Sequence, residues 1–366
     1  MTVTTAFEPK WASKPSDAIR KLLDHRGWMV EDLADRLGIG DPATRRLLAG
    51  TDQITADLAA LLSDRLGGSA SFWLTRERQY RESLEWLTAD ELAQRMPMSQ
   101  MIQLGWIGSS DSWRSQARIG LNFFGASDAE EGANKIRAAV GGAHYRTSTA
   151  FSSDEVTLAA WLRQAEMQVN TLRVDEWDAS RLRNNLAAMR DLTRVPDPAD
   201  FLPALQKLGA ESGVAIVLVR APKGCVLSGA AFKTSNGAAA IGLTARHLSD
   251  DHLWFTVFHE IGHLLLHGVD ETFLDDFETA EHSDEASSLE AEADDFARQS
   301  LVPAGIESLR ITGRGPTKRD VLRFASRENV SAGAVVGQLQ HEGVLQFSQL
   351  NALKRRYKWD GTTLRI

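Results

Sequence analysis

The chain has 366 residues, of which 43% are hydrophobic, and a formal net charge of −8. This length allows two or three domains with their own cores, and the negative charge argues against a protein that coats nucleic acid non-specifically. Cys225 is the only cysteine. An intrachain disulfide and a thiolate-rich zinc site are therefore excluded, and any metal must be bound by His, Asp or Glu.

The hydrophobic pattern predicts a mainly α protein with a small β-sheet, of the α+β class. We expect three regions, residues 1–90, 91–210 and 211–366. The N-terminal residues lack the basic-then-apolar pattern of a signal peptide, and no apolar run is long enough to cross a bilayer. We therefore expect a cytoplasmic protein with no membrane partner.

Residues 1–90 have the pattern of a bundle of short amphipathic helices. Residues 38–40 form a tight turn between two of them, and the following helix is expected to have Asp41 as N-cap and Pro42 at its first position. Thr55 is expected to cap the next helix. Helix, three-residue turn and helix within a small bundle is the helix-turn-helix arrangement.

The stretch that starts at "LADRLGIGDPATRRLLAG" and ends at "FWLTRERQY" resembles the xenobiotic-response-element type of helix-turn-helix domain. Its "FWL…Y" end makes it most similar to HigA-type antitoxins. The similarity covers roughly Ser13 to Ser83. It implies a role in transcription regulation, of the kind found in toxin–antitoxin systems.

The residues that would read DNA depart from the usual pattern. Gly40, Asp41 and Pro42 occupy the positions where Arg, Lys, Gln, Asn or Ser is typical, and Asp41 would repel phosphate. Arg45 and Arg46 remain candidates for contact with DNA. This region carries 12 Lys and Arg against 14 Asp and Glu, so it has no basic footprint. DNA binding therefore stays open beside a fold kept for dimerisation or for docking onto a similar domain.

Residues 91–210 read as helices without a chemical motif, and we expect a packing spacer that supports a homodimer. The hydrophobic pattern then changes from that of helices to that of strands. Short apolar runs separated by turn signals follow, at Gly213–Arg220, Cys225–Phe232 and Ala238–Ala245. They predict a three-stranded meander. Since the third run leads almost directly into the next helix, we expect the meander to supply an exposed edge that takes an extended peptide.

The segment "WFTVFHEIGHLLLHG" carries the strongest chemical signal. A helix places positions i and i+4 on one face, so His259 and His263 can aim at one ion with Glu260 beside them. In this HExxH motif the imidazoles bind zinc and the Glu moves a proton from the attacking water to the leaving amine. A buried helix with hydrogen-bonded histidines is the alternative. Burying such groups in an apolar helix costs on the order of several kcal/mol without partners, which favours a metal site.

A catalytic zinc site needs a third protein ligand. His267 lies two turns from His259, about 12 Å of helix rise, which is too far for one shared ion. The residues after His263 also lack the Gly and His of a metzincin continuation. A carboxylate on a second helix remains, and "LEAEADDFA" offers Glu290 and Glu292.

Apolar spacing in this second helix separates the two candidates. Glu290 lies beside the buried face marked by Ala293 and Ala297, whereas Glu292 faces water. Asp294 follows Glu290 by one turn, where it can accept the free N–H of a ligating His. We expect Glu290 as the ligand and Asp294 as its support, with Glu292 as the alternative ligand. The acidic residues 269–288 before this helix are expected to form a loop.

The pair of motifs "WFTVFHEIGHLLLHG" and "EAEADDFARQSLVP" resembles the ImmA/IrrE family of metallopeptidases. The similarity covers roughly Gly213 to Tyr357, and Asp294 satisfies the family's Asn or Asp in the second motif. It implies a zincin-like C-terminal domain with zinc endopeptidase activity. Its implied substrates are helix-turn-helix repressors, cut to release phage, mobile-element or stress genes.

Two functions therefore stay open. The first is a zinc endopeptidase whose helix-turn-helix domain targets or regulates it. The second is a DNA-binding regulator or antitoxin-like protein whose metallopeptidase domain acts only as a sensor. The intact set of His259, Glu260 and His263 favours the first, because a pure binding protein has no need of Glu260.

Overall fold

The computed structural model describes residues 8–141, 153–270, 272–275, 284–310 and 315–366. Within these ranges the chain is mainly helical, with one four-stranded and one two-stranded sheet, which confirms the expected combination of many helices with little sheet. None of the described helices is both long and apolar enough to cross a membrane. The chain divides into two compact units, Met1–Gln94 with Ser109–Ala133 (unit 1) and Arg95–Gly108 with Asn134–Ile366 (unit 2). The division at residues 90 and 210 stays a prediction.

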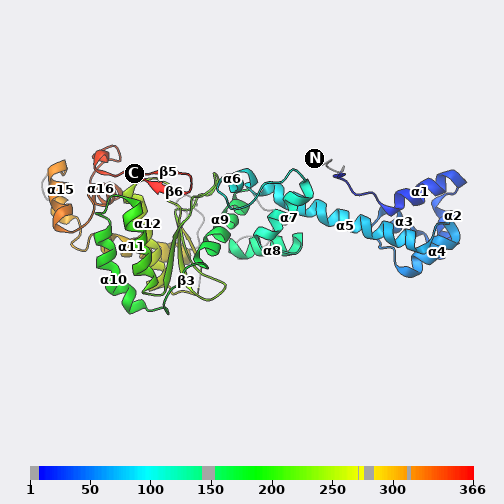
Figure 1. Ribbon diagram of the computed structural model, residues 1–366, viewed down its shortest axis with the longest axis horizontal. Helices are drawn as coiled ribbons and strands as arrows, with labels where there is room; N and C mark the ends of the chain where they lie inside the picture. The colour runs from blue at the N-terminus through cyan, green and yellow to red at the C-terminus, as the bar shows by residue number, and fades with distance from the viewer. Residues whose placement is uncertain (1–7, 142–152, 271, 276–283, 311–314) are drawn as a thin grey trace, which may run out of the picture. The chain divides into compact units, whose positions relative to one another are not determined.

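Unit 1 is built around a small helical bundle whose core holds Ile19, Leu33, Leu62 and Trp73, all of which are fully buried. The bundle lies at the blue end of the chain in Figure 1. The helices that begin in this unit are α1 (Pro15–Arg26), α2 (Val30–Leu37), α3 (Asp41–Ala49), α4 (Ala56–Leu66), α5 (Ala70–Arg95), α7 (Trp113–Phe123) and α8 (Ala129–Ala139).

The turn between α2 and α3 has the expected length but a different cap. Gly40 is the N-cap of α3, at φ 76°, and Asp41 is already inside the helix. The expectation of Asp41 as N-cap was therefore wrong, because this turn needs a positive φ that glycine adopts without strain. Thr55 caps α4 as predicted, since its side chain accepts a hydrogen bond from the Leu58 N–H.

Unit 2 contains both sheets and the helices that cover the larger one. Its helices are α6 (Met98–Gln103), α9 (Ser153–Val169), α10 (Ala179–Leu192), α11 (Pro198–Ala210), α12 (Asp250–Leu266), α13 (Asp284–Leu301), α14 (Glu307–Arg310), α15 (Lys318–Arg327) and α16 (Ala332–His341). Its strands are β1 (Val214–Leu218), β2 (Gly229–Lys233), β3 (Ala239–Leu243), β4 (Phe273–Asp275), β5 (Lys358–Asp360) and β6 (Thr363–Arg365).

The larger sheet has the order β1-β3-β2-β4, with β1 parallel to β3 and the other pairs antiparallel. The expected three-stranded meander is therefore wrong. The chain between β1 and β2 is long enough to pass over one strand position, so β3 lies between β1 and β2, and only β2 and β3 form a hairpin. The sheet also gains β4 from the acidic segment expected to be a loop. Residues 276–283 of that segment lie outside the described residues.

The two faces of this sheet are covered by different helices (Figure 1). Ala215 and Val217 belong to a core with Trp161 of α9, whereas Val214 and Ile216 belong to the main core with α10, α11 and α12. This alternation follows from the period of a strand, in which successive side chains point to opposite faces. All five residues of β3 are buried, and α12 follows β3 directly in the order of elements.

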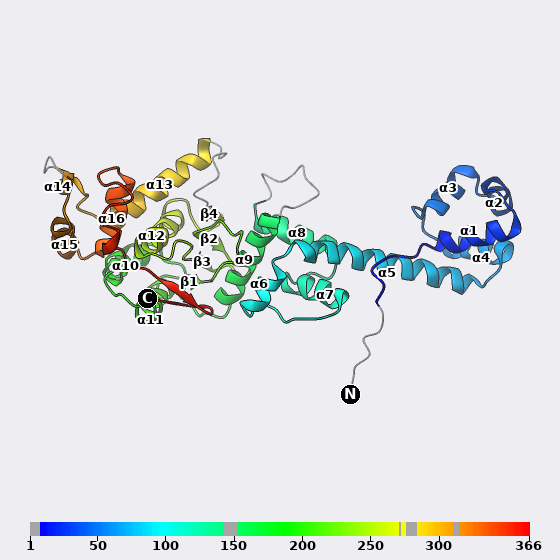
Figure 2. The same cartoon turned by 90° about the horizontal axis from the view of Figure 1, so that it is seen from above.

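Helices α12 and α13 pack side by side (Figure 2). Their close approach depends on small residues. A Cβ placed on Gly262 would lie 3.1 Å from the Phe296 ring and 3.3 Å from the Ala293 backbone. Helix α10 contacts the C-terminal ends of both helices. Arg183 donates to the Leu265 carbonyl of α12 and Arg190 to the Ser300 carbonyl of α13, each at 3.2 Å. The two helices that carry the HExxH motif and its carboxylate partner are thus fixed against each other.

Candidate metal centre

The two histidines of the HExxH motif project from α12 toward the same point. His259 and His263 are 1% and 0% exposed, and their Nε2 atoms lie 3.0 Å apart. Burial lowers the pKa of His263, because a charged imidazolium is poorly solvated there. The neutral imidazole is the form that binds a metal ion.

Glu290 reaches this point from α13. Its Oε2 lies 3.1 Å from His259 Nε2 and its Oε1 lies 3.4 Å from His263 Nε2. Burial by itself would raise the pKa of Glu290, but hydrogen bonds from His259 and His263 outweigh it and bring the pKa to about 2. The side chain is therefore an ionised carboxylate at neutral pH.

The donor set fits a catalytic zinc ion. His259, His263 and Glu290 each offer one atom, and these atoms lie within 4.8 Å of one another. Two ligands bonded at about 2.0–2.2 Å to a tetrahedral zinc are about 3.3–3.6 Å apart. The two Nε2 atoms lie 3.0 Å apart, and the two Glu290 oxygens lie 3.1 and 3.4 Å from them, so a small outward movement accommodates the ion. Two imidazoles and one carboxylate also leave a fourth position open, as catalytic zinc sites do.

Each of these histidines is also held at its outer nitrogen. Asp294 Oδ1 lies 3.0 Å from Nδ1 of His259, and Nδ1 of His267 lies 3.1 Å from Nδ1 of His263. Glu292 continues the second contact, with its Oε2 3.2 Å from Nε2 of His267. Asp294 thus contacts the outer nitrogen of His259, whereas Glu292 contacts His267 and lies outside the group of three converging atoms.

Glu260, the residue after His259 in the chain, is fully buried, and β2 makes room for its carboxylate. A Cβ on Gly229, the first residue of β2, would lie 2.4 Å from Glu260 Oε1 and 2.6 Å from the Thr256 methyl group. Only a residue without a side chain permits this contact. Nothing in the sequence around Gly229 pointed to this role, because the contact joins residues distant along the chain.

Strand β4 covers the other side of the centre. The ring of its first residue, Phe273, stacks on His263 with centroids 4.4 Å apart and planes 10° from parallel. Because β4 pairs only with β2 at the end of the sheet order, it forms the sheet edge nearest to His263 among the described strands. Strand β3 has a partner on each side, so it offers no edge itself.

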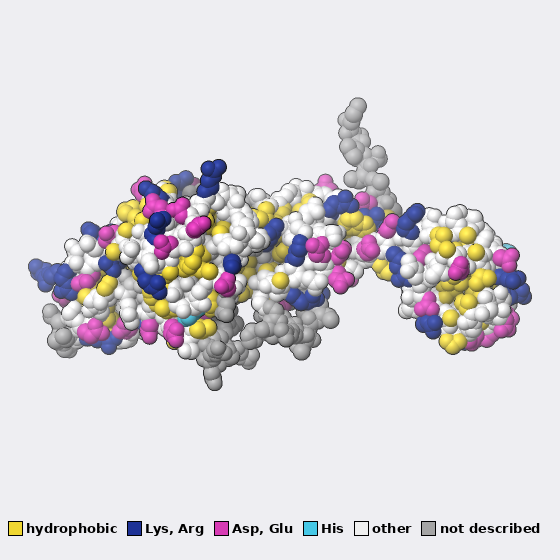
Figure 3. Space-filling model, turned by 90° about the horizontal axis from the view of Figure 1, so that it is seen from below, with side chains coloured by type: hydrophobic (Ala, Val, Ile, Leu, Met, Phe, Trp, Pro, Cys, Tyr) yellow, Lys and Arg dark blue, Asp and Glu magenta, His cyan; other side chains and the backbone are white. Residues whose placement is uncertain are grey.

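The arginines put forward for DNA contact are engaged in ion pairs. Arg45 lies 2.8 Å from Glu31 and 3.2 Å from Asp41, and Arg46 lies 2.9 Å from Asp52. On the face drawn in Figure 3, Lys and Arg side chains of the α1–α4 bundle are interspersed with Asp and Glu. A DNA phosphate would have to compete with these carboxylates for each arginine.

No curated protein and no solved structure matches the chain. A family model does match part of it, and the matched part contains β2, β3, α12, α13 and most of α16. All the residues of the candidate centre lie inside this part. Residues 225–340 match the model of the family Peptidase_M78, the IrrE N-terminal-like domain, so this region is similar to metallopeptidases of the ImmA/IrrE type.

Proposed function

We propose that the chain is a zinc-dependent endopeptidase. The observation that carries the proposal is the convergence of His259, His263 and Glu290 from two helices onto one point, and the buried Glu260 follows the first of these ligands in the chain. The similarity of residues 225–340 to a metallopeptidase family supports the same reaction class. A structural zinc site would be closed by a fourth protein ligand, and the group of ligands found among the described residues has three.

Each residue of the centre then has a distinct task. When bound, a zinc ion would polarise the scissile carbonyl and acidify the attacking water. Glu260 takes the proton of that water and later delivers it to the leaving amine. Asp294 and His267 keep the rings of His259 and His263 in orientation from behind, as outer partners of ligating histidines do.

The substrate would bind as an extended strand along β4. This strand lies at the sheet edge, and its Phe273 is packed against His263. An extended peptide that pairs with such an edge gains main-chain hydrogen bonds and lies alongside the reacting group. The residues after β4, 276–283, lie outside the described part of the chain.

For the natural substrate we propose a helix-turn-helix transcriptional repressor, whose cleavage would release stress, phage or mobile-element genes. The helix, three-residue turn and helix formed by α2 and α3 in unit 1 support a module that recognises a similar domain in the repressor or pairs two copies of this chain. The balanced charge of that bundle suits protein docking better than phosphate binding.

The test compares three full-length proteins, namely the wild type, Glu260→Gln and His259→Ala. We expect one zinc per wild-type chain and per Glu260→Gln chain by elemental analysis, and clearly less in His259→Ala. Proteolysis of a helix-turn-helix repressor should fall about 10²–10⁴-fold in Glu260→Gln, since the amide cannot take a proton. Full zinc retention in His259→Ala would refute the site, and full activity of Glu260→Gln would refute the reaction.

A DNA-bound regulator with a sensing metal domain is the second candidate, favoured by the helix-turn-helix arrangement of α2 and α3. A gel shift with promoter DNA and an Arg45→Ala variant separates the two. If Arg45→Ala abolishes the cellular phenotype while Glu260→Gln leaves it intact, the protein acts on DNA and the endopeptidase proposal is wrong.

A further inference from the structure

The packed interface between α12 and α13 extends beyond the metal centre. Phe255 stands one turn before His259 on α12, with ring centroids 6.2 Å apart. Arg298 stands one turn after Asp294 on α13, with Nη1 3.9 Å from Oδ2. The helices are antiparallel here, so Phe255 and Arg298 lie on the same side of the centre. One helix turn is about 5.4 Å, which is between the rise of one residue, about 3.3 Å, and that of two residues, about 6.6 Å, in an extended peptide.

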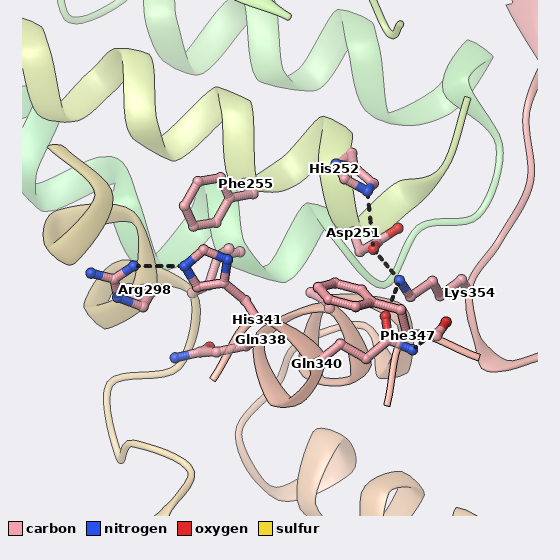
Figure 4. Close-up of a pocket in the computed structure, with 12 residues that line it drawn as sticks. Asp251, His252, Phe255, Arg298, Gln338, Gln340, His341, Phe347 and Lys354 are labelled. Carbon is pink, nitrogen blue, oxygen red and sulfur yellow. Dashed lines mark hydrogen bonds and ion pairs between the residues drawn. The ribbon is translucent and has the colours of Figure 1, made fainter. Parts of the chain in front are cut away.

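A cavity of about 110 Å³ opens at this place. Its apolar wall is made by Phe255 and Leu301 on the two helices, by Ala334 on α16 and by Phe347 beyond it (Figure 4). Arg298 and His341 face each other at one side of the cavity, 3.5 Å apart. The cavity is thus an apolar hollow with a polar rim, built entirely within unit 2.

The wall of the cavity indicates the chemistry of an occupant. Most of the surface that faces the hollow is apolar, and it comes from Phe255, Leu301 and Phe347. The side-chain oxygen of Gln338, which also belongs to the lining, is closed off from solvent and offers no contact to an occupant. The cavity therefore suits an apolar side chain.

The volume sets the size of the occupant. An apolar cavity of about 150 Å³ accepts one benzene molecule, and sites for drug-sized ligands begin at about 300 Å³. A cavity of about 110 Å³ therefore suits a single side chain of leucine, methionine or phenylalanine size. It is too small for a folded segment or a nucleotide.

We propose that this cavity is a subsite for one large apolar side chain of the bound polypeptide, and that it sets where the chain is cut. The inference rests on the endopeptidase function proposed above and adds the substrate preference, which is cleavage next to a large apolar residue. Phe347 and Lys354, which line part of the cavity, lie outside residues 225–340. The preference therefore depends partly on residues beyond the region that resembles the family.

The first experiment measures binding without catalysis. N-acetyl-phenylalanine amide, which carries one apolar side chain and peptide N–H groups, is titrated into the zinc-loaded full-length chain and followed by saturation-transfer NMR. N-acetyl-glycine amide and N-acetyl-glutamate amide are the comparison probes. We expect the phenylalanine probe to bind at least about tenfold more tightly than either, as buried apolar groups do in such subsites.

Two variants and one control locate that binding. Ala334→Leu fills the cavity and should weaken the phenylalanine probe at least about tenfold, whereas Ala352→Leu adds the same atoms at an exposed position and should change nothing. Phe347→Ala removes a wall residue that is 75% exposed, so it leaves folding intact even if Ala334→Leu does not fold. Equal binding of the three probes, or unchanged binding in both cavity variants, would overturn the subsite.

The second experiment maps cleavage of reduced and alkylated β-casein by mass spectrometry. Wild type should cut next to Leu, Met or Phe at one fixed position relative to the bond, and Ala334→Leu should shift this preference toward smaller residues. Cuts without a shared preference would overturn the subsite. Tight binding of the phenylalanine probe without proteolysis of either β-casein or a helix-turn-helix repressor would keep the subsite and refute the endopeptidase function instead.

Discussion

His263 and His267 face each other through their Nδ1 atoms at 3.1 Å, and Nε2 of His267 continues to Glu292 at 3.2 Å. If His263 uses Nε2 for an ion, its Nδ1 carries the proton and donates it to His267. Then Nε2 of His267 must carry the next proton and donate it to the carboxylate of Glu292. The two contacts therefore fix which nitrogen of each ring carries the proton, namely Nδ1 in His263 and Nε2 in His267.

We expect His267→Ala to lower zinc affinity about 10–100-fold, the usual loss when the outer partner of a ligating histidine is removed. Competition with a chelator of known affinity measures it without any substrate. His267→Gln keeps an acceptor for the His263 N–H and should recover part of the loss. His252→Ala, on the same helix but outside this chain of contacts, is the matched control. Equal zinc affinity in wild type and His267→Ala would contradict the role.

Gly229→Ala should lower proteolysis at least about 10²-fold, the lower end of a general base's contribution, and leave zinc bound. The added methyl group would overlap the Glu260 carboxylate, so the base is displaced while the ligands are untouched. Gly108→Ala adds the same methyl group where nothing lies within 4 Å and should keep full activity. A Gly229→Ala protein with normal proteolysis would show that the carboxylate does not depend on this contact.

Gly262→Ala should separate α12 from α13. Its methyl group would press on Phe296 and on the Ala293 backbone, and overpacking of this kind costs about 1–3 kcal/mol of unfolding free energy. Because the ligands come from both helices, zinc affinity should fall together with stability. Urea unfolding and chelator competition on the same protein measure both quantities. A loss of stability without a loss of zinc affinity, or the reverse, would contradict this prediction.

Asp250 makes the stability of unit 2 depend on pH. It is fully buried at the start of α12, and Oδ1 accepts a hydrogen bond from the Arg355 N–H at 2.9 Å. Burial, with help from the neighbouring Asp251, raises its pKa from 3.8 to about 6. A carboxyl group with a raised pKa binds its proton more tightly in the folded state. Its contribution to stability is therefore largest at low pH and is lost as pH rises through about 6.

Asp250→Asn imitates the protonated carboxyl at every pH. Relative to wild type, its unfolding free energy should rise by roughly 1–2 kcal/mol between about pH 5 and pH 8. Urea titrations followed by tryptophan fluorescence, on both proteins across this range, give the difference. Parallel pH profiles of the two proteins would mean that Asp250 does not titrate in this window.

Some features of the site and the fold could be predicted from the sequence, and others could not, for physical reasons. Helical period alone placed Glu290 toward the core and Asp294 one turn further on, because both belong to one regular helix. The parallel pairing of β1 with β3 was missed, since short apolar runs encode burial and not strand order. Gly229 and Ala334 were missed because each acts through a contact with a residue distant in sequence.

The position of the proposed ligands on two helices has a consequence beyond the proposed reaction. An ion shared by His263 and Glu290 would tie together two parts of the chain that β4 and the residues after it separate. Such an ion is a non-covalent cross-link, and it would add roughly 4 kcal/mol to the folded state when free metal is 1,000 times the dissociation constant. Zinc scarcity would then shorten the lifetime of the protein in the cell, because chains without the ion unfold and are degraded more often.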